Sequence, residues 1–135
     1  MNDCIFCKII KGEIPSAKVY EDDKVYAFLD IMPVNPGHTL VIPKKHSENI
    51  FDTDDGDLKA IAVALKKVSI AVKKGVKADG INIGQGNGRA AGQAVFHLHF
   101  HIMPRFENDG LEMFPQKKYR EGEMQQVAGK IKSFL

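Results

Sequence analysis

Three of the five histidines stand at alternate positions, at His97, His99 and His101, with an apolar residue in each gap. Alternation with a period of two is typical of a half-buried strand, so we expect the three imidazoles to share one face while the apolar residues anchor the strand from behind. Successive residues on that face lie roughly 6.5–7 Å apart, which lets the row contact one extended anionic group or hold one metal ion. The row is therefore predicted to be a working surface.

Two chemistries fit this row of histidines. A neutral imidazole is a competent nucleophile near pH 7, because an unperturbed histidine titrates near about 6.5 and clustered histidines oppose one another's protonation. His99 is the natural nucleophile, since it has a neighbour on each side that can orient it or donate a proton to a leaving group. A three-histidine zinc site that activates water is the alternative. The spacing alone leaves both open.

A glycine-rich loop precedes the histidines and helps to separate the two chemistries. Four glycines between Gly84 and Gly92 free the backbone to turn its N–H groups toward an anion, and Arg89 adds positive charge. The segment lacks the P-loop pattern and leads into a strand instead of a helix. Beside three histidines, such a loop favours a phosphate group as the target.

Composition and charge limit the class of protein. A chain of 135 residues suits one domain with a sizeable core. Its 19 Lys and Arg against 17 Asp and Glu argue against a general nucleic-acid binder, which usually has a pronounced basic excess. We find no apolar run of membrane-spanning length and no signal-peptide pattern, so we expect a cytoplasmic protein that does not enter a membrane. In that reducing compartment, the C-x-x-C pair Cys4 and Cys7 predicts a metal or redox site before a disulfide.

The elements that position these residues follow from periodicity and turn residues. A short helix is predicted from Cys4 to Lys11, because apolar residues recur at helical spacing and Gly12 can end it. A long helix is predicted at about 54–74, where apolar residues lie three and four apart, and a C-terminal helix at 119–135. The histidine row forms one strand, and four others are predicted at 18–21, 25–30, 38–43 and 80–83.

These elements predict an α+β fold. Strands joined by short connections favour an antiparallel meander, and the long helix between the third and fourth strands must cover one face of it. We therefore expect a five-stranded antiparallel meander sheet with one long helix on it, a short N-terminal helix and a C-terminal helix. The chain is predicted to be a single domain, 1–135, with a core of about 4–105 and a C-terminal helical extension of about 106–135.

The pattern H-φ-H-φ-H-φ-φ from His97 to Met103, preceded by Gly92-Gln93, resembles the histidine-triad (HIT) family. The wider sequence resembles the Hint or protein-kinase-C-inhibitor-like branch of that family in bacteria. Further blocks in the matching order carry the resemblance over most of the chain: Cys4-Ile-Phe-Cys-Lys-Ile-Ile, Glu13-Ile-Pro, Asp30-Ile-Met-Pro, His38-Thr-Leu-Val-Ile-Pro-Lys-Lys-His46 and Pro104-Arg105. A HIT-like fold is thus implied.

The resemblance implies a nucleotidyl hydrolase or transferase. It would act on the α-phosphate of nucleoside phosphoramidates or related nucleotide conjugates, with His99 attacking phosphorus to form a nucleotidyl-histidine intermediate. His101 would contact the phosphoryl or leaving-group atoms, and His38 would support the triad. The alternatives are a dinucleoside polyphosphate hydrolase and a purine-nucleotide-binding module with incidental turnover. The resemblance also implies a homodimer in which two sheets join into one, and no cofactor for the chemistry itself.

The resemblance also implies a set of nucleotide-binding residues. Asp30 would receive the ribose hydroxyls, and its carboxylate is a suitable acceptor. The base would lie among apolar residues that, without the resemblance, would be interpreted as ordinary core: Ile5, Phe6, Ile9, Phe28 and Ile31. The phosphate loop would contribute Asn87 and Gln93. The sequence departs from the family at Gly86, where relatives often carry Asn or Gln, and at Ala94, where they often carry Ser or Thr, which affects the leaving-group contacts.

The two cysteines gain a specific meaning from the same resemblance. Some histidine-triad proteins pair an N-terminal C-x-x-C with two histidines around a structural zinc, and the matching residues here are Cys4, Cys7, His46 and His97. Two thiolates and two imidazoles form a closed tetrahedral set that zinc favours. In this interpretation His97 holds metal instead of taking part in the chemistry. The alternative is that the cysteines are free thiols on a short helix.

Overall fold

The computed structural model describes residues 3–135, and its first element is the short helix α1 (Ile5–Ile10). The Cys4 thiol caps this helix by accepting the backbone N–H of Cys7 at 3.4 Å, which satisfies one of its free amide donors. The buried residues of α1 are Phe6 and Ile9, so its apolar side faces the sheet. The predicted N-terminal helix is confirmed.

Three consecutive strands form the first part of the sheet: β1 (Lys18–Glu21), β2 (Val25–Leu29) and β3 (Thr39–Pro43). They pair antiparallel in chain order. Asp22 fixes the turn between β1 and β2, because its Oδ1 accepts the backbone N–H groups of Lys24 and Val25 at 2.8 Å each. All residues of β3 are buried, as expected for a strand with packed layers on both faces.

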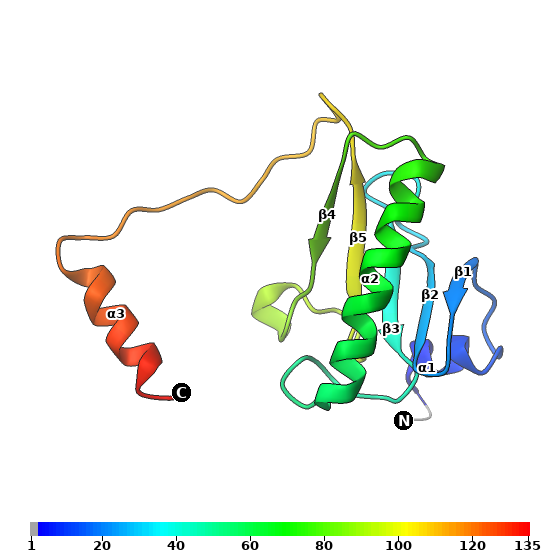
Figure 1. The fold of residues 1–135 in the computed structure, drawn as a ribbon, viewed down its shortest axis with the longest axis horizontal. Helices are drawn as coiled ribbons and strands as arrows, with labels where there is room; N and C mark the ends of the chain where they lie inside the picture. Colours follow the sequence, from blue (N-terminus) through cyan, green and yellow to red (C-terminus); the bar gives the residue numbers. More distant parts are fainter. Residues whose placement is uncertain (1–2) are drawn as a thin grey trace.

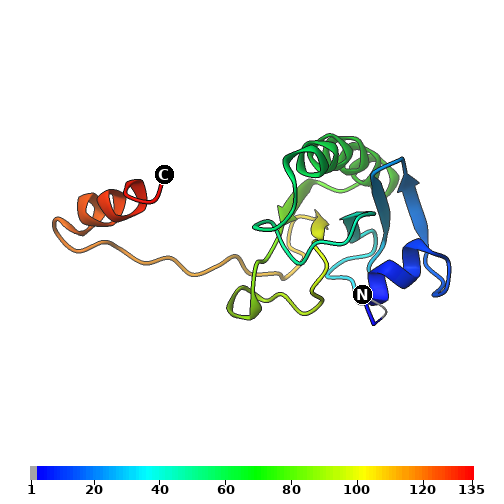
Figure 2. The same ribbon diagram turned by 90° about the horizontal axis from the view of Figure 1, so that it is seen from below.

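The long helix α2 (Asp55–Gly75) covers one face of the sheet (Figure 1). Asp54 caps it by accepting the Asp57 N–H at 2.9 Å. Its apolar side includes Ile61, Leu65 and Val68, which lie in one buried cluster with residues of β2 and β3. A second cluster, to which α1 contributes, lies on the opposite face. The view from below shows α1 and α2 on opposite sides of the sheet (Figure 2).

The last two strands, β4 (Gly80–Gly84) and β5 (Phe100–Arg105), complete a five-stranded antiparallel sheet. The predicted α+β class is confirmed, but the strand order differs from a simple meander, because β5 lies between β3 and β4. At 1.5 Å per residue α2 is about 30 Å long and carries the chain back along the sheet. Thus β4 runs parallel to β3 one position away, and β5 fills the gap antiparallel to both.

The histidine strand begins later than predicted. β5 starts at Phe100 and not at His97, so the first part of the histidine row lies in the segment before the strand. The pairing with β3 ends there because the next positions along β3 lead to Pro43, which has no N–H to donate. The N–H of Leu98 bonds to the carbonyl of Ser47 at 2.8 Å instead.

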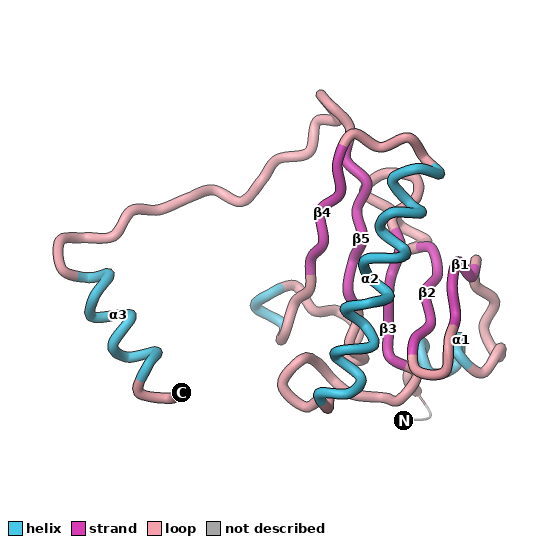
Figure 3. Tube along the Cα trace, viewed as in Figure 1, coloured by secondary structure: helices cyan, strands magenta, loops and turns pink. Residues whose placement is uncertain are grey.

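After β5 an extended segment at 106–122, with no helix or strand, leads to α3 (Glu123–Lys132) (Figure 3). This confirms the predicted C-terminal helix, which begins later than residue 119 and ends earlier than residue 135. The helix stands apart from the sheet in both perpendicular views (Figures 1 and 2), and none of its residues is buried. Within residues 3–135, no helix has the length and apolar character needed to cross a membrane.

Candidate active site

The histidine side chains lie on the face of the sheet that carries α1. The ring of Phe6 meets the rings of His97 and His99 edge-on, with centroids 5.9 and 5.3 Å apart. The rings of His99 and His101 are neighbours, with centroids 5.1 Å apart. Between the histidines, Leu98 is fully buried in the cluster beneath α2. The alternation in the sequence thus separates a row of imidazoles from the apolar core, as predicted.

One hydrogen bond fixes the state of His99. Its Nδ1 lies 2.7 Å from the main-chain oxygen of His97. A carbonyl oxygen only accepts, so Nδ1 carries the proton and Nε2 carries the lone pair in the neutral ring. The edge-on contact with Phe6 limits how far the ring can turn. His99 therefore presents a lone-pair nitrogen in a defined direction, which is the requirement for a nucleophile.

A directional chain of hydrogen bonds fixes the state of His101 in the same way. The N–H of Val34 donates to Nδ1 of His38 at 3.1 Å, so the proton of neutral His38 must be on Nε2. That nitrogen lies 2.9 Å from Nδ1 of His101 and donates to it. The proton of neutral His101 is consequently on its own Nε2. His101 thus supplies an N–H donor beside the lone pair of His99.

Burial keeps these two histidines neutral near pH 7. Burial, together with the neighbouring His99 and His38, lowers the pKa of His101 to about 4. Burial also lowers the pKa of His38, although the charge of Asp30 opposes this. Asp30 lies just past β2 with Oδ2 3.7 Å from Nε2 of His38, and its Oδ1 accepts the N–H of Met32 at 2.9 Å. The carboxylate is therefore held at the entrance to the histidine row.

A second cluster of four ligand atoms lies at the other end of the row. Nδ1 of His97 is 3.3 Å from Sγ of Cys4, 3.6 Å from Sγ of Cys7 and 3.2 Å from Nδ1 of His46, which in turn is 3.5 Å from Sγ of Cys7. With Zn–S near about 2.3 Å and Zn–N near about 2.0 Å, the N–N and N–S edges of a tetrahedral site are about 3.3–3.6 Å. The arrangement therefore has the size of a tetrahedral zinc site.

Hydrogen-bond polarity separates this cluster from a second possible metal group, formed by Asp30, His38 and His101. Nε2 of His97 donates to the carbonyl of Pro43 at 2.8 Å, which leaves the Nδ1 lone pair free for a metal. Nε2 of His38, in contrast, carries a proton that it donates. The cysteine cluster is thus prepared for a cation and the other group is not. The row histidines also face different partners, which argues against the alternative three-histidine zinc site.

The predicted base-binding residues fall into two groups. Phe6, Ile9 and Phe28 are buried in the cluster beneath α1, so they serve as core residues at least. Ile31 is 95% exposed and Ile5 is 46% exposed, so these side chains are accessible to a ligand. Asp30 and Ile31 lie in the loop after β2, where Oδ2 of Asp30 is 3.7 Å from Nε2 of His38.

The glycine-rich loop is held by Asn87 and Gln93. Gln93 is buried; its Oε1 accepts the N–H of Gly88 at 2.8 Å, and its Nε2 donates to the carbonyls of Glu48 and Val95. Oδ1 of Asn87 accepts the N–H of Ile50 at 2.9 Å. These bonds shape the loop, and substrate contact by either residue stays a prediction.

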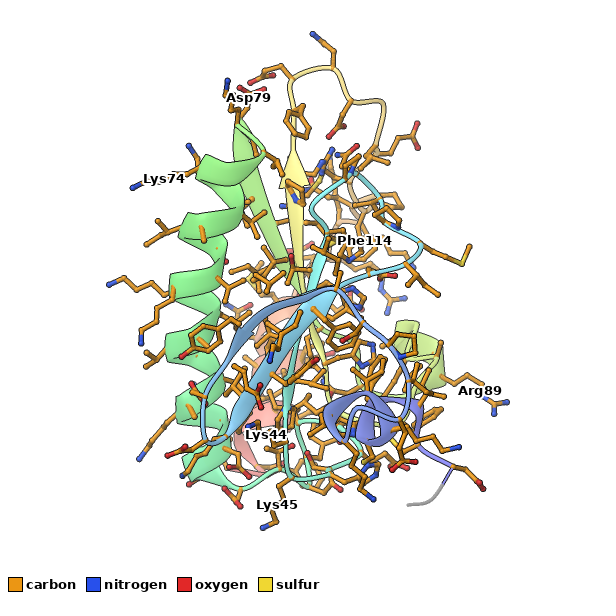
Figure 4. The ribbon with its side chains drawn as sticks, turned by 90° about the vertical axis from the view of Figure 1, so that its right-hand side faces the viewer. Lys44, Lys45, Lys74, Asp79, Arg89 and Phe114 are labelled. Atoms are coloured by element: carbon orange, nitrogen blue, oxygen red, sulfur yellow. The ribbon has the colours of Figure 1, made fainter. Side chains whose placement is uncertain are left out.

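Two other residues of the loop have clear positions. Arg89 is exposed and points away from the molecule on the side of the sheet that carries α1, opposite Lys74 on the outer side of α2 (Figure 4). A Cβ at Gly86 would lie 2.5 Å from the carbonyl oxygen of Ala91. The family departure at position 86 is therefore matched by a close backbone approach that leaves no room for a side chain.

Sequence reasoning missed the groups that set the tautomers. The decisive partners are the N–H of Val34 and the main-chain oxygens of Pro43 and His97. Every residue carries such groups, so no residue type or spacing marks them. The fixed φ of Pro33 and Pro36 on either side of Val34 was the available sign that this loop holds a defined shape.

Comparisons with known proteins agree with this geometry. A family model described as the HIT domain matches residues 11–108. An uncharacterized HIT-like protein of Borreliella burgdorferi is 56% identical over 112 residues, 82% of this chain and 81% of that protein. The adenosine 5′-monophosphoramidase HNT1 of Candida albicans is 45% identical, covering 76% of this chain and 70% of its own length. The adenylylsulfatase HINT3 of Arabidopsis thaliana is 44% identical, covering 82% and 56%.

Two solved structures extend the comparison. The crystal structure of a HIT family member from Bacillus subtilis, 44% identical, matches 98% of this chain and 97% of its own with a TM-score of 0.92. A zinc-bound histidine triad protein from Mycobacterium smegmatis is 36% identical, with a TM-score of 0.79 and coverage of 99% of both chains.

Proposed function

The chain belongs to the HIT-domain family, and we propose that it is a nucleotidyl hydrolase or transferase acting on the α-phosphate of nucleoside phosphoramidates or related nucleotide conjugates. Two relatives with more than 40% identity are named as nucleotide hydrolases of this kind, a monophosphoramidase and an adenylylsulfatase. The observation that carries the proposal is the pairing of a lone-pair nitrogen on His99 with an N–H donor on the adjacent His101.

The proposed reaction has two steps. Nε2 of His99 attacks phosphorus and forms a P–N bond as the bond to the leaving group breaks, while the N–H of His101 stabilises charge that develops on the leaving group. A leaving amine takes up one proton from solvent. Water then attacks phosphorus, the bond to His99 breaks and the nucleoside monophosphate leaves. The attacking water releases one proton to solvent, which balances the proton that the amine took up. Asp30 at the entrance would receive the ribose hydroxyls.

The test is His99→Ala, with Lys66→Ala on the exposed side of α2 as the matched control. Turnover of adenosine phosphoramidate, followed by phosphorus NMR, is expected to disappear in His99→Ala while adenosine monophosphate still binds. A short-lived acid-labile nucleotidyl adduct should form on the wild type and the control only. Full turnover by His99→Ala would overturn the proposal. A panel with dinucleoside polyphosphates distinguishes that substrate class, and binding without turnover of any substrate would indicate a nucleotide-binding module.

We also propose that Cys4, Cys7, His46 and His97 hold a structural zinc ion. The measured edges of the cluster and the free lone pair of His97 support this, and a zinc-bound relative is known from Mycobacterium smegmatis. A bound zinc would join α1 to the sheet. Elemental analysis of untagged protein should give about one zinc per chain, and Cys7→Ser should lose the metal. Protein without metal after purification in the presence of zinc would contradict this site.

We further propose a homodimer and a reducing, cytoplasmic location. β4 lies at the edge of the sheet, so its outer backbone groups are free to pair with a second copy of β4. Such a pair would join two sheets into one around a two-fold axis. The thiols of Cys4 and Cys7 remain available as metal ligands only where they stay reduced. Light scattering on the purified protein tests the dimer, and a monomer at micromolar concentration would refute it.

A further inference from the structure

The short helix α1 connects the cysteine pair to the nucleophile. Phe6 lies between Cys4 and Cys7 in the sequence, and its side chain is buried. The Phe6 ring meets the rings of His97 and His99 edge-on. Nδ1 of His97 also lies 3.3 Å and 3.6 Å from the sulfur atoms of Cys4 and Cys7. A structural change at the two thiols is therefore transmitted to the ring of His99 through α1 and His97.

The segment that carries the nucleophile has few bonds to the sheet. The pairing of β3 with β5 reaches only as far as Phe100, and residues 93–99 lie in no helix or strand. The N–H of Leu98 bonds to the Ser47 carbonyl at 2.8 Å, and the His97 imidazole donates to a main-chain carbonyl at 2.8 Å. The position of His97 therefore helps to decide how firmly the next imidazole in the row is held.

The helix α1 depends on its neighbours for stability. It has six residues, and a helix of that length does not persist alone in water. Its buried side chains are Phe6 and Ile9. A metal ion held by the cysteines together with His46 and His97 would tie α1 to the segment after β3 and to the segment before β5. Without these bonds, apolar packing alone keeps α1 against the sheet.

The two thiols are accessible to a small reagent and close to one another. Cys4 and Cys7 are both half-buried, whereas His97 is fully buried. A hollow of about 460 Å³ opens beside them, and its walls are formed by Asp3, Cys4, Ile5, His46 and residues 94–96. The two sulfur atoms lie within 4.8 Å of each other. A disulfide joins its sulfurs at about 2.0 Å, so rotation of the two side chains can close the gap.

We propose that Cys4 and Cys7 form a reversible redox switch for the catalytic site, with a small-molecule disulfide such as glutathione disulfide as the oxidant. One cysteine thiolate attacks a sulfur of the oxidant, whose S–S bond breaks, and a mixed disulfide forms as one thiolate leaves. The other cysteine attacks the mixed disulfide, so that the bond between Cys4 and Cys7 forms and a second thiolate leaves. The cysteines lose two electrons and the oxidant gains them. No proton is transferred when both cysteines start as metal-bound thiolates.

Oxidation disconnects α1 from the histidines. Two of the four metal ligands are consumed, so the zinc ion dissociates. The cysteines are then joined to each other and no longer to His46 and His97. Phe6 moves away from the imidazole rings, and the ring of His99 loses the contact that limits its rotation. Reduction and return of zinc reverse the change. The inference rests on the hydrolase and the zinc site proposed above, and it adds a regulation of that site.

Treatment of the zinc-loaded protein with glutathione disulfide tests the switch. A chromogenic chelator should detect about one released zinc per chain as two thiols disappear. Both cysteines lie in the tryptic peptide that ends at Lys8, and this peptide should lose two hydrogens without linking to another chain.

Hydrogen exchange reports the release of α1. The amides of Lys8 and Lys11 bond to the carbonyls of Cys4 and Cys7 at 3.1 Å each. Their exchange should rise at least tenfold on oxidation, while the amides of α2 stay unchanged. Turnover of adenosine phosphoramidate should fall at least tenfold, and the ring-nitrogen NMR signals of His99 should shift. Dithiothreitol with zinc should restore all of these values.

Two controls separate the disulfide from other effects. The double variant Cys4→Ser/Cys7→Ser has no thiols, so its α1 exchange should be the same with and without glutathione disulfide. Reduced wild type stripped of zinc by a chelator has no disulfide, and its α1 amides should exchange as fast as those of the oxidised protein. Protected α1 amides in the stripped protein would contradict the role of the metal in holding α1.

The remaining outcomes distinguish the proposals. Oxidised, zinc-free protein with protected α1 amides and full turnover would refute the switch, as would retention of both thiols in excess glutathione disulfide or disulfides between chains. A reduced protein that holds no zinc would refute the zinc site and the switch together. A reduced, zinc-loaded protein that turns over no phosphoramidate, but whose α1 opens on oxidation, would refute the hydrolase and leave the redox step intact.

Discussion

Replacing His38 with phenylalanine removes the directional hydrogen bonds while keeping an aromatic ring of similar shape in a buried position. The side chain of His38 receives the Val34 N–H at 3.1 Å and donates to His101 at 2.9 Å. In His38→Phe, the Val34 N–H and Nδ1 of His101 both lose their partner. Because no group then donates to Nδ1 of His101, its two neutral tautomers become nearly equal in energy. The proton of His101 is therefore no longer kept on Nε2.

The size of the effect follows from these two bonds. Each unpaired buried group costs about 1–3 kcal/mol, and burial of the phenyl ring offsets part of this, so the free energy of unfolding should fall by about 2 kcal/mol. Loss of a correctly placed donor should lower kcat for adenosine phosphoramidate by roughly 100-fold, the lower end of the range of acid–base contributions. The rate should fall less for a nitrophenyl ester of adenosine monophosphate, since nitrophenolate leaves readily without help.

The assay compares kcat for the two substrates in His38→Phe and in Thr39→Val. Thr39 is fully buried and its hydroxyl donates to the Gly37 carbonyl at 2.8 Å, so the control removes a neighbouring buried hydrogen bond and leaves the histidine chain intact. Thr39→Val should be less stable by about 1 kcal/mol with little change in kcat for either substrate. An equal loss of kcat for both leaving groups in His38→Phe would refute a donor role for His101 at the leaving group.

Three other predictions follow from the same contacts. His101 has a pKa of about 4 in the folded protein against about 6.5 unfolded, so the unfolded state binds more protons between these values. Its own contribution to the free energy of unfolding should fall by about 2 kcal/mol from pH 7 to pH 5, and in denaturant titrations the fall should be smaller by about that amount in His101→Gln. Gly86→Ala should destabilise by about 1–3 kcal/mol because its Cβ meets backbone, whereas Gly80→Ala meets nothing within 4 Å; equal melting temperatures would contradict this. Phe6→Leu should lose about 1–2 kcal/mol of stability with the edge contacts to the imidazoles, and an unchanged melting temperature would refute that packing role.

The sequence predicted the helices, the strands and the common face of the histidines, because these depend on periodicity that residue types display directly. It did not predict the place of β5 between β3 and β4, since the path that α2 takes across the sheet is not visible in local pattern. It also placed the start of the histidine strand too early. The effect of Pro43 lies on the neighbouring strand, so it emerges only when the pairing of β3 with β5 is known.

In the candidate site, too, some features could be predicted from residue type and others depend on the tertiary structure. Asp30, the row histidines and the four residues proposed as zinc ligands were all identified from residue type and resemblance, and the structure brings each set together. The base-binding residues were harder, because Phe6, Ile9 and Phe28 have the composition of a core and do lie in one. A role for them beyond packing depends on which edges a nucleotide can reach, and residue type does not encode that.

The three row histidines differ because each uses a different nitrogen in its fixed hydrogen bond. His97 donates through Nε2 and presents Nδ1, while His99 donates through Nδ1 and presents Nε2. His101 accepts at Nδ1 and presents a proton on Nε2. A cation requires a lone pair, a phosphorus atom requires a lone pair with room for a substrate, and a leaving group requires a proton. Alternation placed three equal side chains on one face, and main-chain groups of neighbouring segments then made them unequal.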